Sequence, residues 1–424
     1  MFKNRVVRNT GWLIFEHIFR MILSLLVTSI VARYLGTYNY GLINYGLAYI
    51  TIFLNISSLG IDSILVYEIV SNEKKTGEMI GTAMFMRVIS SLISVIFIYT
   101  IVSHMNSNNS LLVIITFIQS ISIIFASFDL LKYWFQSNLN SKYVVLSKLI
   151  AFTLVSSWRI ILVALKVEVE YFAIATIIET FTAAVVLFIS YYKHRGPTLK
   201  IKLSLMNVLL KKSYLFIVAG LLVSIYTQID KIMLGKMFDI SSVGIYTAAM
   251  NIAGLWIFIP MAIIESLRPL IMKEKNVSQE RYEYLFSKLN SIIIWISIAA
   301  AISITLLSKY IIIIIYGRGF LESTPILIIL VWSRIFSLLG TTRTMWLISE
   351  NLKRYVNVLV GIGAIINFSM NLYLIPIYGA LGAAIATIIA EFISSFLVLY
   401  FLRDTKPLAK MISSAFLHPL KYLK

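Results

Sequence analysis

Residues 149–166 read LIAFTLVSSWRIILVALK, an apolar run with a single arginine, Arg159, about ten residues from its start. A run of this length and hydropathy can cross the ~30 Å hydrocarbon core of a bilayer as one helix. A cation near the bilayer centre costs roughly 3 kcal/mol on insertion scales, so it normally faces a partner or a water-filled cavity. The segment therefore predicts a membrane helix with a charged side chain directed into the protein.

The composition agrees with a lipid environment for most of the chain. The 424 residues are 59% hydrophobic and only 13% charged, with a mean hydropathy of +0.88, whereas soluble proteins average about 25% charged residues. The chain has no cysteine and four scattered histidines, which argues against thiolate sites and metalloenzymes. The net charge of +18 is typical of nucleic-acid binding in a soluble protein, but its location here, in loops between apolar runs, points to membrane topology instead.

Apolar runs of similar length recur along the chain and predict an all-α integral membrane protein with twelve transmembrane helices. We expect spans near residues 10–33, 40–61, 80–102, 111–128, 149–166, 171–191, 213–234, 244–265, 289–310, 324–348, 356–377 and 379–402. The basic amino terminus leads into the first run without a small-residue cleavage site, which favours a retained helix over a removable signal peptide.

The distribution of basic residues supports this count and predicts that both termini lie in the cytoplasm. With that orientation 26 of the 37 Lys and Arg residues fall on the inner side, five on the outer side and six within the spans. Lys and Arg concentrate in cytoplasmic loops, so a miscounted helix would scramble the alternation. The two long inner connections carry amphipathic patterns, LSLMNVLLKK (203–212) and YEYLFSKL (282–289), which predict helices at the inner interface that contact anionic lipids.

The chain also divides into two halves that echo one another. We predict an N-terminal six-helix bundle at 1–192, a basic cytoplasmic linker at 193–212, a C-terminal six-helix bundle at 213–402 and a basic cytoplasmic tail at 403–424. The first span ends ARYLG (32–36) and the seventh ends KIMLG (231–235), so their Leu-Gly pairs are offset by 199 residues. Six spans return the chain to the same side of the membrane, which predicts parallel repeats that enclose a substrate between them.

Four segments carry a family resemblance that covers essentially the whole chain. They are ARYLGTYNYGLINYG (32–46), DKIMLGKMFDISSVGIYTAA (230–249), PMAIIESLRPLIMKEK (260–275) and NFSMNLYLIPIYGALGAAIATIIAE (367–391). In their order and spacing the chain resembles bacterial polysaccharide-export flippases of the Wzx type. These belong with MATE exporters and the lipid II flippase in one superfamily, the MOP superfamily.

The resemblance implies a V-shaped, MATE-like pair of bundles that works by alternating access without ATP. The implied substrate is an undecaprenyl-diphosphate-linked oligosaccharide repeat unit, for O-antigen of lipopolysaccharide or a similar surface polysaccharide, moved from the cytoplasmic to the outer leaflet of the inner membrane. A polysaccharide polymerase and a chain-length regulator are the implied protein partners. No cofactor and no nucleic acid are expected, although coupling to H⁺ or Na⁺ is.

Six cations lie within the predicted spans, namely Arg20, Arg87, Arg159, Lys231, Arg334 and Arg343. Arginine binds phosphate groups bidentately, which suits a diphosphate in a water-filled cavity. Arg343 lies near the inner end of its span and is expected to reach the interface by snorkelling, and Lys231 lies near the outer end of the seventh span. Arg33 joins the candidates because its setting is similar to that of an arginine important in the lipid II flippase branch. The predicted substrate-binding residues are Arg20, Arg33, Arg87, Arg159 and Arg334.

Four acids near or within the spans are candidates for ion coupling or gating, namely Glu16, Glu179, Asp230 and Glu391. Glu16 precedes Arg20 by four residues, so the two can pair along one helix face, with or without lining a cavity. Glu179 and Glu391 are also possible structural partners for Arg159 and Arg334, and a structural role at a helix end is equally open for Asp230. Small residues at 361–364 and 379–384 predict close helix packing.

Two other classes of function compete with a glycolipid flippase. A drug or cation exporter of the MATE type would favour an acidic or apolar cavity, whereas bases outnumber acids in these spans. A membrane-bound polymerase or glycosyltransferase would need a sizeable catalytic loop, but the predicted outer loops are short and carry no catalytic motif. We therefore predict a transporter rather than an enzyme, with a lipid II flippase as the nearest rival.

Overall fold

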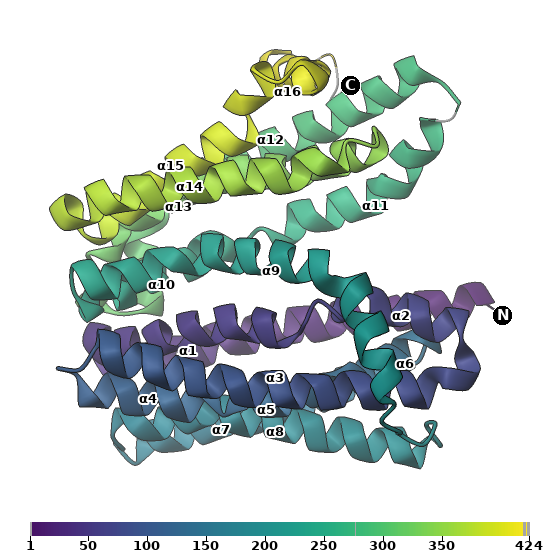
Figure 1. Cartoon of the computed structure of the whole chain (residues 1–424). Helices are drawn as coiled ribbons and strands as arrows, with labels where there is room; N and C mark the ends of the chain where they lie inside the picture. Colours follow the sequence, from purple (N-terminus) through teal and green to yellow (C-terminus); the bar gives the residue numbers. More distant parts are fainter. Residues whose placement is uncertain (1, 276, 419–420, 422–424) are drawn as a thin grey trace. The chain divides into compact units, whose positions relative to one another are not determined.

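The computed structural model describes residues 2–275, 277–418 and 421, and every regular element in these residues is a helix (Figure 1). The all-α prediction is therefore confirmed. The chain forms two compact units, Met1–Gln228 and Ile229–Lys424. The first unit thus extends beyond the expected linker into the segment predicted as the seventh span.

Long apolar helices build the first unit, and α1, α3, α7 and α8 run alongside one another in it (Figure 1). Its elements are α1 (Phe2–Ser57), α2 (Asp62–Ser71), η1 (Glu73–Lys75), α3 (Thr76–Met105), α4 (Ser110–Ser120), α5 (Ser122–Ala126), η2 (Ser127–Leu130), α6 (Leu131–Ser137), α7 (Lys142–Ala164) and α8 (Val169–Lys193). The next helix, α9 (Leu203–Met237), contributes residues to both units.

The second unit continues from α9, and within it α13 packs against α10, α12 and α15. Its elements are α10 (Ile240–Leu255), α11 (Phe258–Glu274), α12 (Gln279–Ile315), η3 (Arg318–Phe320), α13 (Ser323–Ser349), α14 (Lys353–Tyr378), α15 (Ala380–Ser395), η4 (Leu397–Tyr400), η5 (Arg403–Thr405) and α16 (Lys406–Leu417).

The helices account for twelve spans once two irregular ones are resolved. Ten described helices are long and apolar enough to cross a bilayer, and the pair α10 and α11, bent by 43°, makes one more. The first of the ten, Phe15–Ser71, has 57 residues, or roughly 85 Å of helix, more than twice the hydrocarbon thickness. Gly36 breaks it with φ 70° and ψ 178°, a conformation that glycine adopts readily, between the two spans predicted at 10–33 and 40–61.

The connection after α8 is tied to the first unit by its backbone. The amide of Lys200 donates to the Gly77 carbonyl at 3.2 Å, and the amide of Lys202 donates to the Thr82 hydroxyl at 3.0 Å. A Cβ at Gly77 would lie 2.2 Å from the Thr198 carbonyl oxygen, so only glycine allows this approach. The predicted basic linker is therefore a strap, residues 196–202, held along the first turns of α3.

In the two inner connections the amphipathic patterns lie within longer helices rather than in helices of their own. Both patterns are helical, but 203–212 forms the start of α9 and 282–289 lies near the start of α12. In the second segment Tyr282, Phe286 and Leu289 are fully buried. Their apolar face packs against α16, which the sequence had indicated only as a basic tail, and α16 crosses the direction of α12 steeply in Figure 1.

Two glycines from the segments predicted to permit close packing should respond differently to a methyl group. A Cβ at Gly382 would lie 2.2 Å from the carbonyl oxygen of Leu374, a backbone atom that cannot move aside, whereas nothing lies within 4 Å of a Cβ at Gly361. We expect Gly382→Ala to destabilise the protein by about 1–3 kcal/mol. Gly361→Ala should be neutral or stabilising by up to about 1 kcal/mol, because alanine is the better helix former. Thermal unfolding of both variants in detergent tests this, and equal melting temperatures would contradict the packing described.

Candidate functional site

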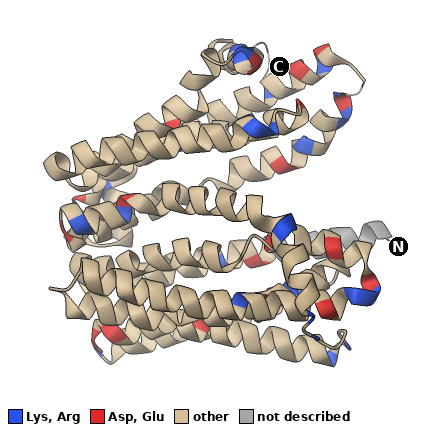
Figure 2. Ribbon diagram, viewed as in Figure 1, with Lys and Arg blue, Asp and Glu red and all other residues tan. Residues whose placement is uncertain are grey.

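A polar cavity of about 320 Å³ lies inside the first unit, between α1, α3, α5, α7 and α8. Its size is at the small end of ligand cavities, so it suits a compact polar group rather than a whole oligosaccharide. Most charges of the chain gather at helix ends, with isolated ones along the middle of the helices (Figure 2). The charged lining residues are Arg20, Asp62, Arg87, Asp129, Lys132, Lys148 and Glu179.

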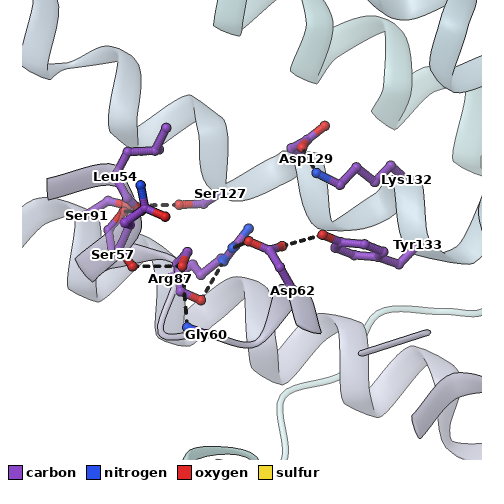
Figure 3. A network of polar contacts seen from close by, with 12 residues as sticks. Leu54, Ser57, Gly60, Asp62, Arg87, Ser91, Ser127, Asp129, Lys132 and Tyr133 are labelled. Atoms are coloured by element: carbon purple, nitrogen blue, oxygen red, sulfur yellow. Dashed lines mark hydrogen bonds and ion pairs between the residues drawn. The ribbon is translucent and has the colours of Figure 1, made fainter. Parts of the chain in front are cut away.

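Arg87 ties the wall of this cavity to the turn between α1 and α2 (Figure 3). The residue is 5% exposed, its Nε donates to the Ser58 carbonyl at 3.2 Å, and its Nη2 forms an ion pair with Asp62. The Tyr133 hydroxyl donates to the other oxygen of Asp62 at 2.7 Å. Arg87, predicted to bind substrate, thus lines the cavity and is also held by a carboxylate and a carbonyl.

The turn itself needs glycine. Gly60 has φ 62°, and a Cβ there would lie 2.7 Å from the Ser213 carbonyl of α9. The turn therefore touches the α9 backbone on one side and receives the Arg87 guanidinium on the other.

Arg20 is shared by two carboxylates. Its Nη1 lies 3.3 Å from Glu16 Oε1 and its Nη2 lies 3.1 Å from Glu179 Oε1, while the guanidinium carbon lies 4.9 Å from the centre of the Phe152 ring. The predicted pairing of Glu16 with Arg20 is confirmed. Glu179, from α8, adds a cross-helix contact that the sequence offered only as a partner for Arg159.

The remaining cationic candidates of the first unit, Arg159 and Arg33, are not among the residues that line the cavity. Arg159 interacts electrostatically with Glu179 and Tyr40, so Glu179 stands near two arginines. Arg33 is exposed, lies three residues before the break at Gly36 and is not among the residues that line the cavity. The structure thus brings Arg20, Arg87 and Glu179 to one cavity, with Glu16 and Arg159 beside it.

In the second unit Asp230 is buried at 5% exposure and accepts hydrogen bonds from three neutral groups. The donors are Tyr246 Oη at 2.6 Å, Asn371 Nδ2 at 2.6 Å and Thr387 Oγ1 at 2.9 Å. Asn371 also donates to Asn367 Oδ1 at 3.1 Å, yet its own Oδ1 is buried without a hydrogen-bond partner. An orphaned oxygen beside a carboxylate is costly and is the kind of group that a small cation would satisfy.

Two arginines of α13 have different surroundings. Arg334 is half-buried, interacts electrostatically with Tyr246 and has an Nε without a hydrogen-bond partner. Arg343 is only 4% exposed, and its Nη1 donates to the Ser394 carbonyl of α15. The expectation that Arg343 snorkels to the interface is therefore wrong, because its guanidinium is buried and donates a hydrogen bond to a backbone carbonyl inside the unit. Glu391 is half-buried within the same unit.

Several residues that complete these groups were not singled out from the sequence. In the first unit they are Asp62, Asp129, Lys132, Tyr133 and Lys148, and in the second Tyr246, Asn367, Asn371 and Thr387. One signal was available, since Asn367 and Asn371 are four residues apart in an apolar run and so share one helix face. The others are polar residues at predicted span ends or single hydroxyls, which carry no distinctive spacing.

Comparisons with known proteins agree with this architecture. A profile of the family described as "Polysaccharide biosynthesis protein" matches residues 6–275. The "Probable flippase AglR" of Haloferax volcanii is 28% identical over 176 residues, which are 41% of this chain and 37% of that protein. The aligned stretch therefore spans little more than a third of that relative's length.

Solved structures of membrane transporters share the fold, among them the following two. The lipid II flippase MurJ in its inward closed conformation superposes with a TM-score of 0.76 at 15% identity, over 96% of this chain and 91% of that one. A multidrug resistance MATE family transporter of the MOP superfamily, in its inward-facing conformation, gives 0.69 at 13% identity, over 93% and 96% of the two chains. The predicted MATE-like fold is thereby confirmed.

The Arg87–Asp62 pair predicts that its two single substitutions reduce the stability of the protein by different amounts. Asp62→Asn leaves the Arg87 charge, whose side chain is 6% exposed, without its counter-charge, which should cost about 3 kcal/mol. Arg87→Met leaves Asp62, whose side chain is 35% exposed and can be hydrated, so it should cost less. Chemical unfolding of both single variants and the double variant measures these costs. The double variant should be more stable than Asp62→Asn alone, and a larger cost for Arg87→Met would contradict this account.

Proposed function

Because this chain belongs to the polysaccharide biosynthesis protein family and has the fold of solved membrane transporters, we propose that it is a flippase for lipid-linked oligosaccharides. The observation that carries the proposal is the cavity of the first unit, which places charged and hydroxyl groups inside an otherwise apolar helix bundle. Such groups are costly in a membrane and are kept there for a polar cargo. The proposed cargo is an undecaprenyl-diphosphate-linked repeat unit of O-antigen or a similar surface polysaccharide.

The ion pairs of the cavity suit an anionic headgroup that binds by exchange. Arg20 already contacts two carboxylates, so an incoming diphosphate can replace one of them without leaving the arginine bare. Arginine favours such oxyanions because its fork of N–H donors matches their geometry. The polyprenyl chain needs no polar contact and can stay in lipid. Rocking of the two halves would then carry the headgroup from the cytoplasmic to the outer leaflet of the inner membrane.

Two related functions remain alternatives. The likeness to the lipid II flippase, at 15% identity, concerns the fold and does not identify the cargo. A transport assay with each substrate would distinguish a lipid II-type cargo from other lipid-linked sugars. A MATE-type exporter of cationic drugs is disfavoured because the four bases that line the cavity outnumber its three acids.

The proposal also includes a location and partners. The protein would lie in the inner membrane with both termini in the cytoplasm, contact anionic lipids, and work beside a polysaccharide polymerase and a chain-length regulator.

We further propose that transport is ion-coupled and that the Asp230 group holds the coupling ion. A carboxylate, two side-chain amides and a hydroxyl offer the oxygen ligands that Na⁺ accepts, and the same carboxylate can instead carry H⁺. The unpartnered Oδ1 of Asn371 supports a cation at this place. Glu16 and Glu179 are less suited, because both already form ion pairs with Arg20.

Deletion of the gene in a strain without a redundant flippase tests the cargo. We expect loss of surface glycan and accumulation of lipid-linked repeat units in the inner leaflet, because synthesis continues while translocation stops. Labelling of cell-surface sugars and extraction of lipid-linked intermediates measure both effects. Normal surface glycan in such a strain would rule the proposal out.

Replacement of Asp230 tests the coupling site. In proteoliposomes, Asp230→Asn should remove the dependence of translocation on a Na⁺ or pH gradient, because the amide carries no charge for the ion. Glu391→Gln, which replaces the other candidate acid of the second unit, should keep the wild-type dependence because Asp230 is the proposed ligand of the ion. Imposing the two gradients separately identifies the ion. A gradient response that survives in Asp230→Asn would exclude this residue.

A further inference from the structure

The polar cavity of the first unit adjoins a second, apolar hollow. This hollow has a volume of about 190 Å³, and all of its lining residues are apolar: Phe125, Phe128, Phe181, Ala184, Val185, Phe188 and Ile189. Phe125 and Ala184 line both hollows, so the charged and apolar spaces share walls at α5 and α8.

The phenylalanines form two edge-to-face pairs across the hollow. Phe125 and Phe181 have ring centroids 5.1 Å apart at 76°, and Phe128 and Phe188 are 6.2 Å apart at 77°. Ala184 lies between Phe181 and Phe188 on the same face of α8, since the spacings of three and four residues match one helix turn. Its small side chain leaves room between the two aromatic pairs. Phe181 and Ile189 are exposed at 48% and 59%, so the hollow opens outward from the helix bundle.

On the polar side one cation stands apart from the ion pairs. Arg20, Arg87 and Lys132 each contact a carboxylate, at Glu179, Asp62 and Asp129 respectively. Lys148 of α7 lines the same cavity, and no carboxylate of the described residues lies within ion-pair distance of it. Lys148 accounts for the excess of one positive charge in the lining.

From these adjoining hollows we propose that the first unit binds a lipid at the point where its polar headgroup joins its apolar chain. The cavity beside Lys148 takes a diphosphate, and the hollow between Phe125, Phe181 and Phe188 takes the first part of the polyprenyl chain. This inference rests on the proposed function, since it names the docking site of that cargo. It differs from it in assigning the chain a protein site rather than bulk lipid.

The chemistry of the two spaces selects this occupant. A water-soluble anion would use the polar cavity but leave the apolar hollow without purpose. A neutral lipid would fill the hollow but would supply no negative charge to pair with Lys148. The polar volume of about 320 Å³ is too small for a complete oligosaccharide, so the sugars would lie beyond it. In the predicted orientation both hollows face the inner half of α8, the side on which lipid-linked sugars are assembled.

Binding to the purified full chain in phosphatidylcholine nanodiscs, followed by native mass spectrometry, tests the site. The probes are undecaprenyl diphosphate, undecaprenol, inorganic diphosphate and phosphatidylglycerol. The double variant Phe181→Ala/Phe188→Ala should weaken undecaprenyl diphosphate binding by about tenfold or more, because aromatic burial is lost, and should leave inorganic diphosphate unaffected. Lys148→Gln should weaken both of these anionic probes.

Two matched variants control for general damage. Phe117→Ala removes a ring that is 41% exposed, makes a similar edge-to-face pair with Tyr99 at 5.5 Å and does not line the hollow. Lys142→Gln removes a lysine of α7 that does not line the cavity. Both should bind undecaprenyl diphosphate as the wild type does.

The outcomes separate this inference from the proposed function. Wild-type protein that binds undecaprenol as tightly as undecaprenyl diphosphate would contradict the flippase proposal itself. Tight wild-type binding that survives in Phe181→Ala/Phe188→Ala would overturn only the chain site. Phosphatidylglycerol that competes equally, with the same dependence on the phenylalanines, would assign the site to a membrane phospholipid and also overturn the inference.

Discussion

A charge placed among apolar helices needs a counter-charge or a hydrogen-bond partner inside the protein, because lipid offers no water to hydrate it. This constraint organises the interior of both units. In the first unit Arg20 and Arg87 meet carboxylates from other turns or other helices. In the second, Asp230 is surrounded by neutral donors and Arg343 meets a backbone carbonyl. The polar groups therefore also specify which helices must lie beside one another.

This arrangement changes the picture of a bare cationic lining. The cavity of the first unit carries bases and acids in nearly equal number, and most of them are paired. A paired arginine can exchange one oxyanion partner for another at little cost, whereas an unpaired one would have to be desolvated anew in each cycle. For the anionic headgroup proposed above, pairing would let Arg20 exchange its oxyanion partners.

The sequence was sufficient for the spans and the mid-span cations, because hydropathy and charge placement report directly on the lipid environment. The Glu16–Arg20 pair could be predicted since its residues are four apart on one helix. The partners of Arg87 and Asp230 could not, because Asp62 and Asn371 are 25 and 141 residues away in the chain and meet only through folding. The amphipathic start of α12 misled for a related reason, since its apolar face meets α16 rather than lipid. The V-shaped arrangement of the halves stays a prediction.

The strap at residues 196–202 bears on where the chain can be cut. A basic connection between two long helices resembles an open site for trypsin, yet its backbone already donates to Gly77 and Thr82 and lies against Gly77 too closely for any side chain there. A protease must draw its substrate into an extended strand, which would require this segment to leave α3 first. Lys200 and Lys202 are therefore protected by main-chain contacts. The first unit, if produced as a separate fragment, should retain the strap and the start of α9.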